Sequence, residues 1–574
     1  MRISETSRKR DVQVLIVGAG PVGLTLAIDL GQRGIHVLIV EKQLRASGLP
    51  KMERCHPRTM EICSRLGIAD RVRAIGYRPD DPLDAFFVKT LAEPPIASIP
   101  RPSVNQVRRQ TAMANDGSAA AEPYQIVSQY AIEPLLREVA ESTPGVRVAF
   151  GCELISFTEG ENAVTAELRH ASGEQEIVPA TYMVGTDGGA STVRQALGIE
   201  LRGEPNVHRF IQAQFRCEGL FERIPKGAHY YRADGRWGFL ITQGDCTQFT
   251  LHAEAEDVSE MPRLFEELVG FPVKYEMLYA GPWTMRLMLA ERYASRRTFL
   301  AGDSAHLVTP IGGLGMNTGI GDAIDISWKL AAVLKGWGGK HLLETYEAER
   351  RPIGWRNVKT SERGYVVRRG WSEHCREVLS NGAISPEDYQ ALGEYWKAEH
   401  RKGSLNLLGI SQGYRYLNST ILWQDPVDDE SDQAEFGYVP TTLPGARIPN
   451  IRLNDGRALQ NLIQGDFTLL CRKTPTAGPD AFAKAFGDRG ATFSVLELGD
   501  AMDNVAVYDR DFYLIRPDLH ICWRGDEMPG FTTALVEKVC GDNAFEPERS
   551  GRFEITLGDD ARTRAATATM SFID

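Results

Sequence analysis

The chain has 574 residues and a formal net charge of −11, with 43% hydrophobic and 25% charged residues. This composition is typical of a soluble globular enzyme, and the acidic balance argues against nucleic acid or an anionic membrane as a partner. The length exceeds what one hydrophobic core supports, so we expect about three domains.

Residues 11–42 predict a strand, a tight turn, a helix and a second strand. The β-branched run at 12–17 is typical of a buried parallel strand. It is only a strand's length and leads directly into Gly18-Ala19-Gly20-Pro21-Val22-Gly23, so the basic residues before it do not indicate a signal peptide. In this pattern the first glycine makes the turn, the second lets a pyrophosphate approach, and the third permits close helix packing.

Glu41 ends the second strand, about 20 residues after the glycine turn. A carboxylate there accepts both ribose hydroxyls and repels a 2′-phosphate. The segment therefore predicts a dinucleotide site for FAD or NAD, without choosing between them.

Two later segments repeat the strand–turn–helix plan. "YMVGTDGGASTVRQALGI" ends a strand at Gly185, turns at Asp187-Gly188 and starts a helix near Ser191. "RTFLAGDSAHLVTPIGGLGMNTGIGDA" ends a strand before Gly302-Asp303 and continues through a proline and many glycines. Glycine is permissive but entropically costly, so this density predicts that backbone approaches a ligand closely. No run in the chain nears the roughly 18 apolar residues of a membrane span.

The ordered motifs GxGxxG, "DGGASTVR" and "GDSAHLVTP" resemble the flavoprotein aromatic hydroxylases, single-component monooxygenases related to p-hydroxybenzoate and phenol hydroxylases. With "RTMEICSRLGI", "SQYAIEPLLRE" and "YEAERRP", the resemblance covers roughly residues 10–360. It implies an α/β fold with a Rossmann-like FAD-binding domain of the p-hydroxybenzoate hydroxylase type and a mixed-sheet substrate domain. In the last third, "DFTLLCRK" and "FYLIRPDLHICWRG" resemble the thioredoxin-like tail of the phenol and polyketide hydroxylase subgroup.

The resemblance also implies which residues hold FAD. The ADP half would be held by Gly18, Gly20, Gly23 and Glu41, with Pro21, Val22 and Lys42 beside them. Gln129 would contact the cofactor, Asp187 would support the pyrophosphate and the nicotinamide substrate, and Asp303 would bond a ribityl hydroxyl. The segment along the isoalloxazine ring would contain Pro310, Gly313, Gly315, Met316 and Asn317. Its backbone N–H groups and the following helix would favour the negative charge of the reduced ring, whereas His306 would be structural.

The family mechanism implies that NAD(P)H reduces FAD and that O₂ then gives a C4a-hydroperoxide, which hydroxylates a phenol. Phenol hydroxylases carry Arg-Ala-Asp-Gly before "RTME", where this chain has Lys51-Met52-Glu53-Arg54. Lys51 would then replace the flavin-side arginine, and Glu53 the carboxylate near the substrate hydroxyl. A solvent-exposed loop glutamate is the alternative reading of Glu53.

The stretch from 229 to 255 predicts strands of the substrate domain. Their alternation would point some side chains into the pocket, although a single aromatic residue more often belongs to a core. The residues considered are Tyr230, Tyr231, Trp237, Phe239, Gln248, Thr250 and His252. The candidates for a catalytic role are Glu53, Tyr231, His252 and Pro310.

We predict an FAD-binding domain at 9–200 and 284–400, a substrate domain at 201–283 with part of 80–125, a linker at 401–440 and a thioredoxin-like domain at 441–574. Ser385, Pro386 and Asp388 predict the start of a helix over 385–403. Nine cysteines are scattered without a CxxC pair, which predicts reduced thiols in a cytoplasmic protein, no metal site and no dithiol chemistry. The tail is then expected to serve packing or dimerisation.

The sequence thus predicts an FAD-dependent monooxygenase that uses NADH or NADPH and O₂ to hydroxylate a phenolic substrate. A simple phenol and a polycyclic, polyketide- or flavonoid-like phenol both fit. Two alternatives stay open on the same fold: a Baeyer–Villiger-type oxygenase or flavin reductase, and a non-catalytic protein that binds flavin or a prenyl chain.

Overall fold

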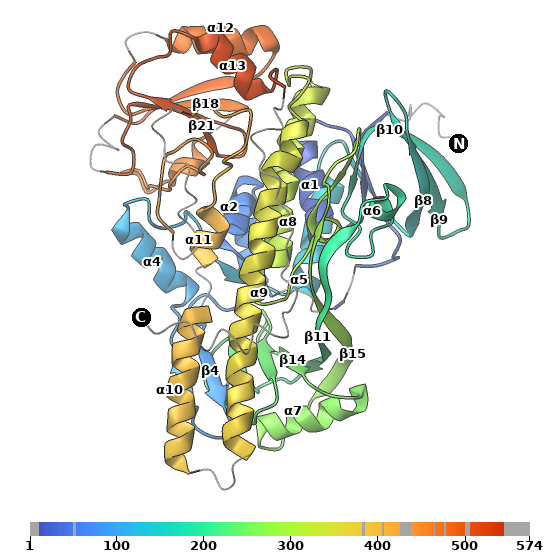
Figure 1. Cartoon of the computed structure of the whole chain (residues 1–574), viewed down its shortest axis with the longest axis vertical. Coiled ribbons are helices and arrows are strands. Elements are labelled where there is room, and N and C mark those ends of the chain that lie inside the picture. Colours follow the sequence, from blue (N-terminus) through green and yellow to red (C-terminus); the bar gives the residue numbers. More distant parts are fainter. Residues whose placement is uncertain are drawn as a thin grey trace, which may run out of the picture.

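The structure is a computed structural model that describes residues 11–46, 48–49, 53–380, 385–403, 407–424, 438–463, 465–475, 478–499 and 505–544. It is an α/β molecule with three larger sheets and one two-stranded sheet (Figure 1). In the view of Figure 1 the long helix α9 (Glu344–Ser380) runs past both the first and the second sheet. Within the described ranges, no helix is long and apolar enough to cross a membrane.

The first sheet brings the three sequence motifs to one edge. Its parallel strands are β7 (Val146–Phe150), β2 (Val37–Glu41), β1 (Val12–Val17), β10 (Gln175–Gly185) and β16 (Thr298–Leu300). The antiparallel strands β8 (Cys152–Glu159) and β9 (Val164–His170) extend it beyond β10. Val17 pairs with Gly185, and Gly185 pairs with Leu300, so the turns after these three strands lie side by side.

Helices pack around this sheet and around the adjoining turns. They are α1 (Pro21–Gln32), α2 (Pro57–Arg65), α3 (Ala69–Ala74), α5 (Gln129–Ser142), α6 (Thr192–Ala196) and α8 (Leu314–Leu334). The short strands β3 (Arg54–Cys55) and β6 (Gln125–Ile126) pair antiparallel beside them. The core of the sheet is apolar, and Val14, Leu15 and Ile16 are fully buried.

The second sheet is mixed and has the strand order β17-β15-β11-β14-β13-β12-β4-β5. Its strands are β4 (Ala85–Val88), β5 (Ala97–Ile99), β11 (Leu201–Arg216), β12 (His229–Arg232), β13 (Gly238–Thr242), β14 (Gln248–Ala253), β15 (Glu276–Ala290) and β17 (His306–Leu307). Only β12 and β4 pair in parallel. Because β15 is one continuous strand, it crosses the predicted domain boundary at 283/284, and the exact boundaries stay predictions.

Helices cover both faces of the second sheet. Helix α7 (Met261–Val269) packs against one face, in the same buried cluster as Tyr230 and Leu251 of the sheet. On the other face, Tyr231 and Phe87 pack against Trp371 of α9 and Trp396 of α10 (Pro386–Gly403). Helix α4 (Val104–Ala114) follows β5.

The start of α10 follows the sequence prediction. Its capping box joins the Ser385 N–H to Asp388 Oδ2 at 2.9 Å, and the Asp388 N–H to Ser385 Oγ at 3.2 Å. This reciprocal pair satisfies two of the N–H groups that a helix start leaves without partners.

The C-terminal sheet has the order β19-β18-β20-β21, with strands β18 (Phe467–Cys471), β19 (Phe493–Glu497), β20 (Phe512–Ile515) and β21 (Ile521–Gly525). Helix α12 (Pro479–Arg489) connects the parallel pair β18 and β19, and α13 (Thr532–Cys540) follows β21. The thioredoxin-like assignment stays a prediction. Cys471, Cys522 and Cys540 are buried free thiols, and burial raises the pKa of each, which disfavours thiolate chemistry.

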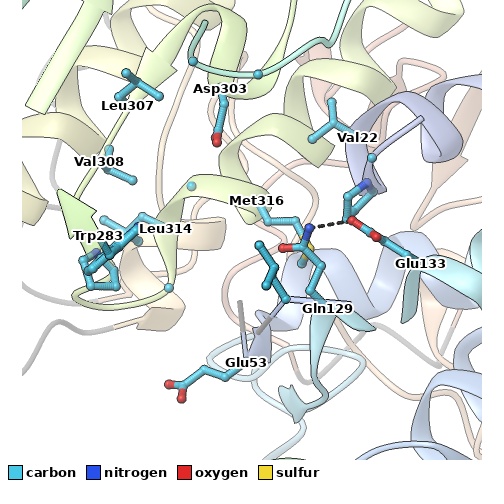
Figure 2. A pocket seen from close by; sticks show the side chains of 18 of the residues that line it. Val22, Glu53, Gln129, Glu133, Trp283, Asp303, Leu307, Val308, Leu314 and Met316 are labelled. Atoms are coloured by element: carbon cyan, nitrogen blue, oxygen red, sulfur yellow. Dashed lines mark hydrogen bonds between the residues drawn. The ribbon is translucent and has the colours of Figure 1, made fainter. Parts of the chain in front are cut away.

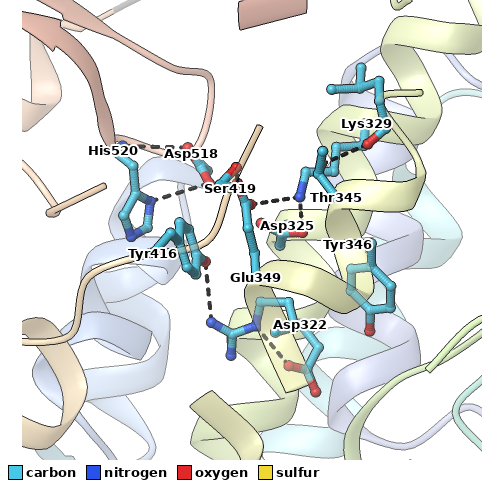
Figure 3. Close-up of polar contacts among 12 residues, drawn as sticks. Asp322, Asp325, Lys329, Thr345, Tyr346, Glu349, Tyr416, Ser419, Asp518 and His520 are labelled. Atoms are coloured by element: carbon cyan, nitrogen blue, oxygen red, sulfur yellow. Dashed lines mark hydrogen bonds and ion pairs between the residues drawn. The ribbon is translucent and has the colours of Figure 1, made fainter. Parts of the chain in front are cut away.

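Buried ion pairs join this C-terminal unit to α8 and α9. Figure 3 shows Asp325, Glu349 and Asp518 of this cluster. Arg516, just after β20, donates to both oxygens of Glu349 on α9 at 2.6 and 2.9 Å. Lys329 on α8 donates to Glu349 and Asp325, each at 2.6 Å. The unit therefore packs within the chain, as expected. The predicted linker contains α11 (Leu407–Gln412), but its residues 404–406 and 425–437 lie outside the described residues. Dimerisation stays a prediction.

Candidate active site

One cavity of about 1160 Å³ connects the glycine turn after β1 with the second sheet. Pockets for a single small ligand are typically about 300–1,000 Å³. The cavity therefore has room for a dinucleotide and a second ligand.

The end of the cavity nearest β1 is shaped by two glycines with different roles. Gly18 has φ +104°, and a Cβ there would lie 2.5 Å from the Thr186 carbonyl oxygen. Gly20 lines the cavity, and a Cβ there would meet no atom of the described residues within 4 Å. Gly18 thus lets the turn after β1 pack closely against the turn after β10, whereas the missing side chain of Gly20 leaves space for a ligand.

Glu41 lies at the same end, at the last position of β2. Its Oε2 accepts the Ala19 N–H at 3.0 Å and its Oε1 accepts the Gln43 N–H at 2.9 Å. Each carboxylate oxygen keeps a second lone pair for a ligand hydroxyl. Pro21, Val22 and Lys42 also line the cavity here, as does Glu41 itself.

Gly23 does not line the cavity, although it was expected to hold the cofactor. A Cβ at Gly23 would lie 2.1 Å from the Gly18 carbonyl oxygen. This glycine is therefore required for packing between α1 and the turn, and its prediction as a cofactor contact is revised.

The middle of the cavity is polar. Asp187 Oδ2 accepts the Val193 N–H at 3.1 Å, while Oδ1 is buried and has no hydrogen-bond partner within the described part of the chain. Burial raises the pKa of Asp187. Gln129 lines the cavity and donates from Nε2 to Glu133 Oε1 at 2.5 Å. Figure 2 shows Asp303 pointing into the cavity, with Leu314 and Met316 between it and Glu53 in that view.

The glycine-rich loop before α8 forms a wall of the cavity. Its lining residues are Pro310, Gly312, Gly313, Leu314, Gly315 and Met316. Gly312 and Gly313 have φ values of +84° and +66°, in the left-handed region that favours glycine. Helix α8 begins at Leu314 without a side-chain cap, so its first N–H groups and the positive end of its dipole lie at the cavity.

Asn317 holds this loop in place instead of reaching the cavity. Its Oδ1 accepts the His56 N–H at 2.8 Å and the Thr59 hydroxyl at 2.6 Å. Its Nδ2 donates to the carbonyl oxygens of Arg54 at 3.0 Å and Gly313 at 2.6 Å. Because the whole amide is used within the protein, the Asn317 side chain positions this loop, and the place of Asn317 along the isoalloxazine ring stays a prediction. His306 is structural as expected, since its Nε2 bonds Asp322 Oδ2 at 2.7 Å and both side chains are fully buried.

A second chamber of the cavity contains the pair of Glu53 and His229. Glu53 Oε1 lies 2.8 Å from His229 Nε2 and 4.0 Å from the Arg54 guanidinium. Burial opposes ionisation of Glu53, but attraction to His229 and Arg54 outweighs it and lowers the pKa of Glu53 to about 2. Burial also lowers the pKa of His229, despite the attraction to Glu53. We therefore describe a carboxylate that accepts Nε2–H from a neutral imidazole, and not a solvent-exposed loop glutamate.

Aromatic residues of the second sheet line the same chamber. Tyr231 is buried, and His252 stacks on Phe239 with ring centroids 4.7 Å apart. Burial lowers the pKa of His252 to about 4, so it is neutral at pH 7. Tyr231, Phe239 and His252 line the cavity, whereas Tyr230 lies on the opposite face and donates to the Pro225 carbonyl at 2.6 Å. The other residues considered there, Trp237, Gln248 and Thr250, are not among those that line it. Lys51 lies outside the described residues.

Several lining residues were not predicted. They are Arg54, Arg101, Tyr124, His229, Trp283, Arg368 and His400. Most come from segments without family motifs, and the packing of α9 and α10 against the second sheet brings Arg368 and His400 to the cavity.

Comparison with known proteins decides the family. Residues 11–361 match the family described as "FAD binding domain", and residues 441–542 match "Aromatic-ring hydroxylase, C-terminal". The chain belongs to the FAD-dependent aromatic-ring hydroxylases. The hydroxylase is 33% identical to "FAD-dependent monooxygenase apdD" of Emericella nidulans, over 90% of this chain and 88% of that protein. It is 30% identical to "4-methyl-5-nitrocatechol 5-monooxygenase" of a Burkholderia species, over 93% and 99% of the two chains.

A solved structure agrees with this assignment. The rebeccamycin biosynthetic enzyme RebC with reduced flavin superposes on this hydroxylase with a TM-score of 0.83, at 30% identity, over 93% of this chain and 99% of that chain. The cavity fits FAD, because Gly20 leaves open space, Asp187 has a buried oxygen without a partner, and α8 starts uncapped at the cavity. FAD is the cofactor of this hydroxylase, and NAD(P)H is the co-substrate typical of the family.

Proposed function

We propose that this chain is an FAD-dependent monooxygenase that uses NAD(P)H and O₂ to hydroxylate a phenolic aromatic substrate. The observation that supports the proposal is one continuous cavity. Its dinucleotide-binding end is joined to a chamber that aromatic residues and a buried carboxylate line. When bound, FAD supplies the oxygen-transfer chemistry. The chain must hold the two ligands together, orient the phenol and keep water out.

The proposed contacts with FAD follow the position of each residue along the cavity. We propose that Gly18, Gly20 and Glu41 hold the ADP half, and that Asp187, Asp303 and Gln129 contact the middle of the cofactor. We propose that the loop from Pro310 to Met316 lies along the isoalloxazine ring. The uncapped start of α8 would then stabilise negative charge at the edge of that ring.

The Glu53–His229 pair is proposed to bind the substrate hydroxyl. A carboxylate with a pKa of about 2 is a weak base at neutral pH. Glu53 is therefore better suited to accept a hydrogen bond from the phenol than to remove its proton completely. This hydrogen bond would orient the phenol and increase the electron density of its ring. Glu53 Oε2 is buried without a hydrogen-bond partner among the described residues, and a ligand hydroxyl would satisfy it. Tyr231, His252 and Phe239 would pack against the ring.

Steady-state kinetics test the proposal. The purified protein with FAD, NADH or NADPH, and simple and polycyclic phenols should show substrate-stimulated coenzyme oxidation and a product with one added ring oxygen. Absence of both effects across the panel would refute it. The relatives named above give no support to the alternatives. Oxygen insertion beside a ketone would nevertheless indicate a Baeyer–Villiger enzyme, and a colourless protein that does not take up FAD would indicate a non-catalytic one.

A cytoplasmic location is also proposed. Its support is the cysteine pattern, since all nine cysteines are buried and unpaired by disulfides.

A further inference from the structure

Three arginines line the substrate chamber: Arg54, Arg101 and Arg368. They come from β3, from the loop after β5, and from α9. Arginine stays protonated in proteins, so their number fixes the charge that the chamber offers to a ligand.

Arg54 has a local counter-ion. Its guanidinium lies 4.0 Å from the Glu53 carboxylate and 5.4 Å from the centre of the Tyr124 ring. Glu53 is the only carboxylate among the described lining residues of this chamber, because the other acidic lining residues belong to the cofactor end and its rim. The Arg54–Glu53 pair therefore adds no net charge.

The guanidinium groups of Arg101 and Arg368 have no carboxylate within 4 Å in the described part of the chain, whereas the Arg101 backbone N–H donates to Asp84 Oδ1 at 2.9 Å. The Arg101 side chain donates to His400 Nε2 at 3.0 Å, and the Arg368 guanidinium lies over the Tyr231 ring at 5.4 Å. Burial and the two neighbouring arginines lower the pKa of His400 to about 2, so this imidazole is neutral. Burial and repulsion from Arg54 and Arg368 lower the pKa of Arg101.

Among the described residues, the chamber thus holds two positive charges without counter-ions. Partly buried charge without a partner is costly, and an anion placed between the two guanidinium groups would relieve both desolvation and repulsion. The planar fork of arginine matches carboxylates and other delocalised oxyanions with paired hydrogen bonds. Tyr231, which lies beneath Arg368, offers a flat apolar surface beside this anion site.

We propose that Arg101 and Arg368 bind an ionised acidic group of the aromatic substrate, so that the enzyme acts on phenols that carry a second, delocalised oxyanion such as a carboxylate. This inference rests on the proposed function, because it places the substrate in the chamber beside FAD.

Matched ligand pairs test it on the holoenzyme. Dissociation constants are measured from the change in flavin absorbance for salicylate against salicylamide, 4-hydroxybenzoate against 4-hydroxybenzamide, and 1-hydroxy-2-naphthoate against its amide. Each acid and its amide have nearly the same shape but differ in charge. We expect the acid of at least one pair to bind about tenfold tighter or more, as for one charge-assisted hydrogen bond.

Arginine variants locate the effect. Arg101→Gln and Arg368→Gln should weaken binding of the preferred acid by about tenfold to a hundredfold and change binding of its amide by less than about threefold. Arg368→Lys, which keeps the charge, should retain part of the preference. The matched control is Arg369→Gln on the same helix, because Arg369 pairs with Glu373 at 2.7 Å outside the cavity lining; it should leave both ligands unaffected.

Four results would overturn the inference. They are equal binding of acid and amide by the wild type, equal weakening of both ligands by the variants, no acid binding up to about 10 mM, and a raised KM for NAD(P)H without a change in acid binding. The last result would assign the arginines to the phosphates of the coenzyme. An enzyme that hydroxylates neutral phenols without any acid preference would refute this inference and leave the proposed function intact. Failure to take up FAD would refute both.

Discussion

Replacing Gly20 with alanine should separate cofactor binding from folding. Gly20 has φ −75° and ψ −179°, which alanine adopts without strain, and its added Cβ would meet no protein atom within 4 Å. The apoprotein should therefore be as stable as the wild type, or more stable by up to about 1 kcal/mol, because alanine restricts the unfolded chain. The new methyl group would occupy the space through which the pyrophosphate approaches.

The expected loss is that of one charge-assisted hydrogen bond, about 1.5–3 kcal/mol, or roughly a 10- to 150-fold increase in the Kd for FAD. Apoprotein is titrated with FAD while flavin fluorescence is followed, and thermal unfolding of the apoprotein is measured in parallel. The matched control is Gly487→Ala in α12, which also meets no atom within 4 Å but lies away from the cavity. Gly23→Ala is the opposite case, because its Cβ would lie 2.1 Å from a backbone oxygen and should destabilise the fold itself.

Wild-type affinity for FAD in a stable Gly20→Ala protein would refute the placement of the pyrophosphate. An unstable Gly20→Ala apoprotein would refute the claim that the space beside Gly20 is open.

Three further predictions concern the chamber, the domain contact and pH. Glu53→Gln should lower the rate of product formation by about 10- to 150-fold, as for the loss of one hydrogen bond to a charged group, while coenzyme oxidation continues, so the ratio of product to coenzyme falls; an unchanged ratio would contradict its role. Glu349→Gln leaves the buried Arg516 and Lys329 short of a counter-charge, and should lower the free energy of unfolding by about 3–5 kcal/mol; an unchanged unfolding temperature would argue against that network. The free energy of unfolding should also fall as pH drops below about 6.5. Histidines of the unfolded chain then take up protons, whereas buried histidines with lowered pKa values in the folded chain do not. For four such histidines the loss is up to about 5 kcal/mol per pH unit. Thermal unfolding between pH 7.5 and 5.5 measures this, and a flat profile would contradict it; the four are His56, His252, His400 and His520.

The cofactor end of the cavity could be predicted because its geometry is local. Gly18, Gly20 and Glu41 lie within one strand–turn–helix–strand segment, and each residue type has a short-range reason to occur there. Parallel strands then bring the later motifs to the same edge. Gly23 shows the limit of this reasoning, because a motif position does not reveal whether the residue faces the ligand or packs against the protein.

The substrate chamber could be predicted only in part. Alternation along β12 to β14 indicated that some aromatic residues face the pocket, but a two-residue period does not say which face of a sheet is covered by helices. Arg101, Arg368 and His400 are brought together by the packing of α9 and α10 on that sheet. No local pattern specifies such a meeting, so only the folded chain identifies these residues.

The central claim is that one cavity holds FAD beside an aromatic substrate whose ring receives oxygen from O₂. Its most direct test is the mass of the product formed under ¹⁸O₂ from the aromatic ligand that binds most tightly, with the coenzyme it uses. The account predicts one ¹⁸O atom in a new ring hydroxyl for each product molecule. A hydroxyl oxygen that comes from water, or coenzyme oxidation that yields only hydrogen peroxide with every ligand, would contradict it.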